Sequence, residues 1–533
     1  MGFSKLDDDE EEPTEPTKDE GPISIDQAVD KIWNGLNIKI VLVFISAVGS
    51  AYLTAAEIYI TIFTGIIPYT DWTCISEKCF GLLIAATPSN NSQTFYSHST
   101  MCGNKLQAGL DFKWTSERTS FSMDWGFYCD TETKLTVVSS FFFIGAFVGL
   151  LSSTAIFDRT GRRNGAIGGS VIAAAATVAA TWIPSYEGLL VVRVFQGFGQ
   201  FINFTGVYCW VIEFAPSHLR SSMSSILLIC WSFGYLVIVL IGYLIPVWNY
   251  IFLATGILNF LFITPLLIYP KSPRFSLVRG KEEEARETLA ALGRICNNKV
   301  EFAAGSLTFK ARKQNYFQQL KDFKKYPTLR KETLLCMGCW FIVACLFYGL
   351  SFGWSKISTD LYGSYLFAAL GKVIAFTILI PICAWLGRKK TMLFFLVCGI
   401  LSNFLAMPDV QLSENWTLEH VSCLLGSIAI TAVFGQLYLF TSEIAPTSHR
   451  GMVMSLSSSA ARVGSFLGTY INLLYDMTDR RVPLGVIAGA TVLCGVAVCF
   501  LSDTTGRRIA ETPEDVEVMS GNKKYQPVQI EAE

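Results

Sequence analysis

Apolar stretches of about twenty residues dominate this sequence, and that is the length of an α-helix that crosses the hydrocarbon core of a bilayer. Inside a bilayer only helices and closed barrels satisfy the backbone hydrogen bonds, so these stretches restrict the fold severely. We expect spanning helices at residues 40–66, 135–156, 165–183, 187–212, 221–244, 247–269, 333–353, 360–383, 391–407, 419–441, 451–475 and 483–502. The chain is therefore predicted to be an all-α membrane protein with twelve transmembrane helices.

Composition agrees with this prediction. The chain is 51% hydrophobic and only 16% charged, which is typical of a polytopic membrane protein in a lipid bilayer. The net charge of −1 indicates no nucleic-acid partner. The first 35 residues are polar and acidic and contain no cleavable signal peptide, so the first helix is expected to insert as its own signal.

Short basic turns set the orientation of the chain in the membrane. Arg162 and Arg163 lie in the turn after the second helix, and Arg388 begins a basic run after the eighth. Lys and Arg accumulate in cytoplasmic loops. Twelve spans keep the two ends of the chain on one side, so we expect both termini to be cytoplasmic.

Two motifs recur at similar offsets and indicate two related halves. The turn Asp158-Arg-Thr-Gly161-Arg162-Arg163 returns in part as Gly387-Arg388-Lys389-Lys390, and Glu213-Phe-Ala-Pro-Ser-His-Leu-Arg220 returns as Glu443-Ile-Ala-Pro-Thr-Ser-His-Arg450. Six-helix halves related by an axis along the membrane normal are a transporter architecture in which substrate binds near the bilayer midplane. We expect such pseudo-symmetric halves here.

The same pattern divides the chain into five parts. They are an acidic cytoplasmic tail at 1–36, a first six-helix half at 37–269 that includes an extracellular loop at 68–134, a cytoplasmic central loop at 270–332, a second half at 333–502 and a cytoplasmic tail at 503–533.

The long polar segment 68–134 contains four of the fifteen cysteines, namely Cys74, Cys79, Cys102 and Cys129. Extracellular cysteines form disulfides, so we expect two, with three possible pairings. The sequon at Asn90 lies in the same segment and is predicted to be glycosylated.

Finer motifs resemble a known family. The turn 158–163 is similar to the helix 2–3 signature of the major facilitator superfamily, and Arg193-Val-Phe-Gln-Gly-Phe-Gly resembles a segment of its sugar-porter-related branches. Asp124-Trp-Gly-Phe-Tyr-Cys129, Pro273-Arg-Phe and Asp503-Thr-Thr-Gly-Arg resemble the organic cation/anion transporter family, solute carrier family 22. The resemblance covers residues 37–515 and implies the major facilitator fold, alternating access and a plasma-membrane location.

Three ionisable residues inside predicted helices are candidates for substrate contact, because intramembrane charges are costly. Arg462 resembles the arginine of the organic-anion branch; that branch also has a helix 8 lysine, which aligns near Phe376, one turn from Lys372. Two cations would attract a carboxylate or sulfate. Alternatively, they pair with backbone carbonyls or with Glu57, which could instead bind an ammonium group or accept a coupling proton.

Aromatic side chains supply stacking surfaces for organic ions. By resemblance to the family, the cavity-lining aromatics are Trp231, Trp340, Phe347, Tyr348, Phe434 and Tyr438. The alternative is that these rings only pack against neighbouring helices or face lipid.

The cytoplasmic motifs are predicted to gate the transporter rather than to bind substrate. Gly161 permits a tight turn, and Asp158 is placed to accept backbone N–H groups at a helix N-terminus. Glu213 is expected to pair with Arg162, Arg163 or Arg220, and Glu443 with Arg388 or Arg450. The alternative is that these charges only fix the topology.

The sequence has no nucleotide-binding loop, hydrolytic triad or metal-ligand spacing, so we expect no enzyme activity, cofactor or metal. The predicted function is transport of small organic ions, slightly favouring anions, and either facilitative or coupled to an ion or counter-substrate. Two alternatives are an organic cation or carnitine-like transporter, and a transport-silent receptor or scaffold, because Lys271 and Ala384 depart from the family pattern.

Overall fold

The structure, a computed structural model, describes part of the chain in detail. The described residues are 23–33, 38–65, 72–74, 112–114, 118–127, 130–216, 220–296, 298, 302, 307–308, 316–357, 361–407, 411–413, 416–446, 448–479, 481–504, 510 and 512–520.

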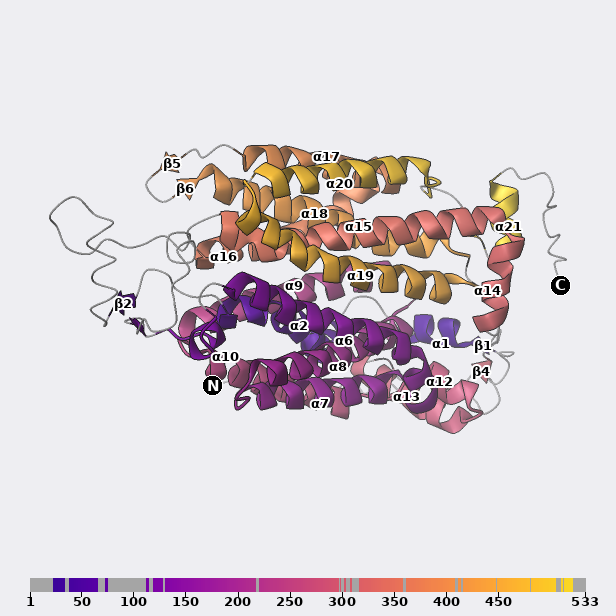
Figure 1. Cartoon of the computed structure of the whole chain (residues 1–533). Helices are drawn as coiled ribbons and strands as arrows, with labels where there is room; N and C mark the ends of the chain where they lie inside the picture. The colour runs from indigo at the N-terminus through magenta and orange to yellow at the C-terminus, as the bar shows by residue number, and fades with distance from the viewer. Residues whose placement is uncertain are drawn as a thin grey trace, which may run out of the picture.

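Twelve spans of helix run roughly parallel through these residues (Figure 1). Those of the first half are α2 (Ile38–Gly65), α6 (Thr131–Thr160), α7 (Arg162–Ala180), α8 (Tyr186–Phe214), α9 (Arg220–Leu244) and the consecutive helices α10 (Trp248–Leu261) and α11 (Ile263–Ile268). Those of the second half are α15 (Pro327–Ile357), α16 (Leu361–Leu386), α17 (Arg388–Leu405), α18 (Leu418–Ile444), α19 (Arg450–Met477) and α20 (Arg481–Phe500). The predicted all-α fold is confirmed.

Seven helices in the described residues are long and apolar enough to cross a membrane by length and composition alone. Apart from α2, in which the side chains of the first turns lie outside the described residues, the remaining spans are less apolar. In α19, for example, serines, an asparagine and Arg462 face other helices instead of lipid. This explains why hydropathy alone does not find every span.

Several helices, among them α6 and α15, are longer than the apolar stretches predicted from the sequence. α6 continues to Thr160 and α7 starts at Arg162, so Gly161 alone separates them, with φ of 84°. The charged motif expected in a loop therefore belongs mostly to helix ends, because charged residues continue a helix readily once it leaves the apolar layer. The sixth span breaks at Phe262, where Pro265 cannot donate to Leu261.

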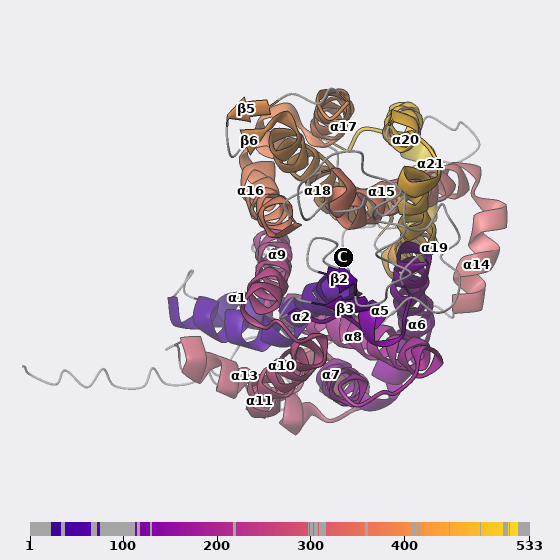
Figure 2. The same cartoon turned by 60° about the vertical axis from the view of Figure 1, so that its left-hand side comes forward.

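The two halves meet along two pairs of helices. Figure 2 shows α6 beside α19 and α9 beside α16, and these pairs make the main contacts between the halves. Within the halves, α6 packs on α8 and α15 packs on α19. One continuous core of buried aromatic and aliphatic side chains extends across both halves.

Short elements gather at the two ends of the bundle (Figure 1). The end that we call the α13 end contains β1 (Ile23–Ser24), α1 (Ile25–Ile32), α12 (Pro273–Val278), α13 (Glu282–Cys296), β4 (Leu307–Thr308), α14 (Tyr316–Lys325) and α21 (Pro513–Met519). The opposite end, the β2 end, contains β2 (Trp72–Cys74), β3 (Phe112–Trp114), α5 (Phe121–Asp124), β5 (Gln411–Ser413) and β6 (Trp416–Thr417). The first pair, β1 and β4, is parallel, and the other two pairs are antiparallel.

Candidate functional site

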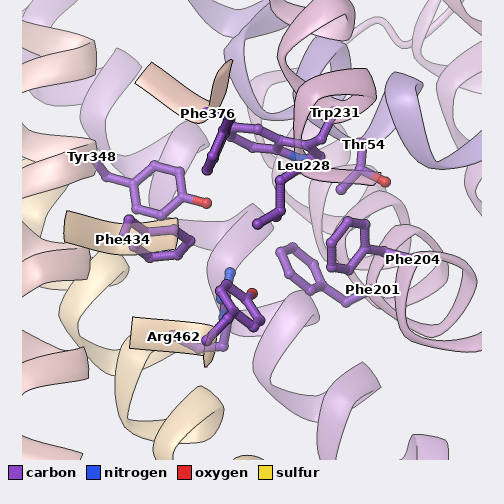
Figure 3. Close-up of a pocket in the computed structure, with 10 residues that line it drawn as sticks. Thr54, Phe201, Phe204, Leu228, Trp231, Tyr348, Phe376, Phe434 and Arg462 are labelled. Atoms are coloured by element: carbon purple, nitrogen blue, oxygen red, sulfur yellow. The ribbon is translucent and has the colours of Figure 1, made fainter. Parts of the chain in front are cut away.

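A cavity lies between the two halves (Figure 3). It contains about 360 Å³ of empty space, part of which is open to solvent. Its lining residues come from both halves and are Thr54, Phe201, Phe204, Leu228, Trp231, Tyr348, Phe376, Phe434, Tyr438 and Arg462.

Arg462 is the charged residue among those that line this cavity. It lies in the middle of α19, and its guanidinium carbon is 4.4 Å from the centre of the Phe201 ring on the other half. Its side chain donates hydrogen bonds to the hydroxyl oxygens of Tyr348 and Tyr438. No carboxylate in the described residues lies within ion-pair distance of Arg462. The guanidinium is therefore placed to bind an anion, helped by two hydroxyl donors.

Four of the six predicted aromatics line the cavity, namely Trp231, Tyr348, Phe434 and Tyr438. Trp340 and Phe347 lie directly behind them. Trp340 contacts Tyr438 with ring centres 4.5 Å apart and donates its indole N–H to Thr441 at 2.9 Å. Phe347 stacks on Phe434 at 5.0 Å. These two rings support the wall instead of forming its surface.

Five lining residues were not predicted, and they are Thr54, Phe201, Phe204, Leu228 and Phe376. The pairs 201/204 and 228/231 have the spacing of one helix face, which is a signal that the sequence contains. That signal is weak by itself, because rings and leucines at this spacing occur throughout membrane helices.

Lys372 is fully buried and does not line the cavity. Its Nζ atom donates to Ser351 Oγ at 3.1 Å and lies 4.7 Å from the ring centres of both Tyr235 and Phe347. A cation over aromatic faces is stabilised electrostatically. Tyr235 belongs to the first half and Lys372 to the second, so this contact joins the halves.

Glu57 lies away from the cavity, inside the first half. Asn259 Nδ2 donates to its Oε1 atom at 2.7 Å, and the hydroxyl of Thr177 donates to the same oxygen. Arg193 donates to the backbone carbonyl of Glu57 at 2.9 Å and to the side chain of Gln196 at 2.8 Å. The structure thus places Glu57 in a buried polar network with Arg193, and not beside Arg462 or Lys372.

An aromatic layer closes the cavity towards the β2 end. Tyr59 of the first half lies 5.4 Å from Phe352 of the second, measured between ring centres. Phe63 lies 5.8 Å from Tyr362 and 5.6 Å from Tyr365 across the same boundary. These rings come from the segments of α2, α15 and α16 that lie nearest the β2 end.

Arg118 connects the halves at the β2 end itself. Its guanidinium donates to the carbonyls of Gly242 at 2.8 Å and Tyr243 at 2.7 Å, in the last turn of α9. It also donates to the hydroxyl of Tyr362 on α16 at 2.7 Å. A cation at a helix C-terminus is stabilised by the helix dipole. The three bonds hold the ends of α9 and α16 together.

Two equivalent ion pairs mark the helix ends on the opposite side. Arg162 follows Gly161 and pairs with Glu213 at 3.1 Å, and Arg388 follows Gly387 and pairs with Glu443 at 3.2 Å. Gly161 and Gly387 have φ values of 84° and 80°, a region that favours glycine. Each pair joins two helices of one half, so neither bridges the halves in this geometry.

The other motif residues lie near these pairs. Arg163 donates to the carbonyls of Leu266 and Leu267, both at 2.7 Å, at the end of α11. The side chain of Asp158 is exposed, and its backbone carbonyl accepts from Arg279 at 3.1 Å. Arg450 begins α19 and is half-buried. Arg220 begins α9, and its side chain lies outside the described residues.

Lys271, which departs from the family pattern, forms an ion pair with a nearby residue. Its Nζ atom lies 2.7 Å from a carboxylate oxygen of Glu284 in α13. The hydrogen bond from this ammonium lowers the pKa of Glu284 below its ordinary value. Lys271 therefore connects α13 to the segment that follows α11 by a solvent-exposed ion pair.

The predicted disulfide and glycosylation sites cannot be placed. Cys79, Cys102, Cys129 and Asn90 lie outside the described residues, as does the side chain of Cys74. In the described part of the chain, no three His, Cys, Asp or Glu residues are grouped so that they could hold a metal ion.

Two six-helix halves around a central cavity define a membrane transporter of the major facilitator type. The family model described as "Sugar (and other) transporter" matches residues 81–348 and 348–507. The chain therefore belongs to that family, and its members are transporters and not enzymes.

Named relatives and solved structures agree with this assignment. The chain is 25% identical to human organic cation/carnitine transporter 2 over 78% of its length and 75% of the relative's. It is 27% identical to organic anion transporter 3 of Pongo abelii, over 79% and 78%. The proton:xylose symporter XylE bound to 6-bromo-6-deoxy-D-glucose superimposes with a TM-score of 0.60 and 16% identity, covering 90% of this chain and 98% of that one. The predicted likeness to the organic ion transporters of solute carrier family 22 is confirmed.

Proposed function

We propose that this protein transports small organic anions across the plasma membrane by alternating access, with Arg462 as the anion contact. One observation carries the proposal: the single charged group on the cavity wall is a guanidinium without a carboxylate partner in the described residues. A low-dielectric site strengthens its attraction for an anion. The lining rings of Trp231 and Phe434 then hold the organic part of the ligand.

The β2 end is proposed to face the cell exterior. The α13 end, where the described residues begin at Ile23 and end at Ser520, is proposed to face the cytoplasm, so that both termini are cytoplasmic. The positive-inside rule supports this orientation, because the basic helix turns and α14 lie at the α13 end. The aromatic layer and Arg118 then form the closed outer side of the cavity, so the structure corresponds to a cytoplasm-facing state. Transport requires these contacts to break while others form at the α13 end.

The charged turns are proposed to act in that closure. Arg162 with Glu213, and Arg388 with Glu443, keep the helix ends of each half in fixed positions. Asp158, Arg163, Arg220 and Arg450, which belong to the same motifs, are proposed to form new contacts with the opposite half when the α13 end closes. Such pairs are individually weak, but several together bias an equilibrium between states that differ by a few kcal/mol.

A carnitine-like zwitterion is a second candidate ligand. Arg462 would bind its carboxylate, and the rings that line the cavity would hold its ammonium group by cation–π contact. The similarity to organic cation/carnitine transporter 2 supports this alternative. The energy source is proposed to be a coupling ion or a counter-substrate, with Glu57 as the acidic group available to bind a proton or cation.

Uptake by cells that express this chain tests the proposal. We would compare a labelled aromatic carboxylate, a quaternary ammonium and carnitine in the wild type and in Arg462→Asp, with Arg462→Lys as the matched control that retains charge. We expect carboxylate uptake to fall at least about 30-fold in Arg462→Asp, because a charge-assisted contact is lost and a like charge is introduced. Surface abundance of each variant serves as the folding control.

The other outcomes are equally informative. Cation uptake that survives Arg462→Asp would refute the anion assignment and leave the rings as the binding groups. Absence of any saturable uptake by a protein that reaches the surface would favour the receptor or scaffold alternative.

A further inference from the structure

The cavity wall presents one cation and almost no other polar surface. Seven of the ten lining residues carry no charge and no tyrosine hydroxyl, and they are Phe201, Phe204, Trp231, Phe376, Phe434, Leu228 and Thr54. The other three are Arg462 and the two tyrosines whose hydroxyls lie beside it. Figure 3 shows the arginine and Tyr348 directed towards the centre of the cavity. The polar chemistry therefore gathers at one point, and the rest of the wall is apolar.

The second cation of the region is separated from the cavity by a ring. Lys372 lies 4.7 Å from the centre of the Phe347 ring, and Phe347 in turn stacks on Phe434, which lines the cavity. Lys372 is fully buried and also faces Tyr235 and Ser351. A ligand in the cavity meets Phe434 and not this ammonium.

One turn further along α16, the cavity is lined by a ring instead of a charge. Phe376 is 2% exposed and packs against α18, where a Cβ atom added at Gly435 would lie 2.6 Å from its ring. This close packing holds the ring in place. The helix that contains Lys372 thus presents an apolar face to the ligand.

We infer that the cavity accepts organic ions with a single anionic group and rejects organic dianions. This inference rests on the proposed anion site and names its substrate class. The first carboxylate has Arg462 and two hydroxyls. A second carboxylate at the other end of the ligand would lose its water and meet rings, Leu228 and Thr54, whose hydroxyl already donates to Gln200 at 3.1 Å. Burying an anion without a partner is strongly unfavourable.

Three matched acids test the inference as competitors and as substrates. They are 3-phenylpropionate, its para-methyl analogue and its para-carboxy analogue, of which the last two have similar size and differ in charge. In the wild type we expect the two monoacids to compete comparably and the diacid to be weaker on the order of 100-fold.

Two substitutions at one position supply the control. Phe376→Lys adds a cation to the apolar wall and is expected to reduce the discrimination against the diacid about tenfold. Phe376→Met removes the ring without adding charge and should leave the ratio unchanged. Lys372→Met should also leave the ratio unchanged, because Lys372 is not in contact with the ligand.

The outcomes separate this inference from the proposed function. If the diacid enters as well as the monoacids and Lys372→Met abolishes only its uptake, Lys372 serves as a second anion site and the inference is wrong, although the anion assignment stands. If the methyl analogue is excluded as strongly as the diacid, the cavity selects ligands by size and not by charge, and the inference is also wrong. If no acid binds while a quaternary ammonium does, both proposals are refuted.

Discussion

The two halves are alike at their helix ends and different in the middle of the membrane. Both have a glycine turn followed by an arginine that pairs with a glutamate, Arg162 with Glu213 and Arg388 with Glu443. In the first half, however, the buried Glu57 and Arg193 belong to one hydrogen-bonded network. In the second half, Arg462 and Lys372 have no carboxylate partner in the described residues.

This difference suggests a division of roles within a duplicated fold. The first half neutralises its buried charge internally, so it contributes an apolar wall to the cavity. The second half keeps uncompensated positive charge, one cation on the cavity wall and one held by aromatic rings. We therefore expect the charged group of the ligand to bind mainly to the second half.

The strongest test of this comparison removes one buried charge from each half. Glu57→Leu should lower the free energy of unfolding by about 3 kcal/mol, because Arg193 stays buried without its neighbouring carboxylate. Lys372→Met should be neutral or stabilising, since it replaces an uncompensated buried cation by an apolar side chain of similar length. Thermal unfolding of the purified proteins in detergent measures both.

Thr177→Val is the control for the first substitution. It removes one hydrogen bond to Glu57 and should cost about 1 kcal/mol. Equal destabilisation by Glu57→Leu and Lys372→Met would mean that the halves do not differ in the way described.

A second, smaller effect concerns the contact that joins the halves at the β2 end. Arg118→Ala should increase opening there, because α9 loses the cation at its C-terminus and Tyr362 keeps only its own hydrogen bond to the carbonyl of Gly242, at 3.1 Å. We expect labelling of an introduced Phe63→Cys by a membrane-impermeant maleimide to rise about tenfold. Peptide-resolved mass spectrometry separates this cysteine from the native ones.

Arg118→Lys keeps the charge but not the three-way geometry and should give an intermediate value. Labelling that is the same in Arg118→Ala and in the parent would show that this contact does not hold the halves together.

The smallest effect tests the likeness of the halves. Glu213→Gln and Glu443→Gln should each lower the free energy of unfolding by about 0.5–1 kcal/mol, and by similar amounts, because both carboxylates are partly exposed and pair with one arginine. Thermal unfolding of the two purified variants measures both changes in the free energy of unfolding. Glu443 also accepts a hydrogen bond from Thr504 at 2.7 Å. A clearly larger loss of stability in Glu443→Gln would therefore show that this hydrogen bond contributes to the stability of the second half.

Local sequence patterns were sufficient to predict the helices. Apolar length located twelve spans within a few residues, with the exception of the break at Phe262 that Pro265 causes. The repeated motifs restricted the partner of Glu213 to Arg162, Arg163 or Arg220 and that of Glu443 to Arg388 or Arg450. The structure pairs Glu213 with Arg162 and Glu443 with Arg388. Arg462 was also identified, since a charge in the middle of a membrane helix is conspicuous without any knowledge of neighbours.

The neighbours of each buried charge could not be predicted from the sequence. Sequence alone left Glu57 free to pair with Arg462 or Lys372, and it gave Phe376 no part in the cavity. Which side chains meet depends on how α2, α7 and α8 are rotated against one another, and that rotation is set by packing between segments that are far apart in the sequence. The apolar runs and motifs of this chain determined its helices, its halves and its transporter class. Only the tertiary structure decided that one cation reaches the cavity while another is enclosed by rings, because burial is a property of the packed assembly and not of any single helix.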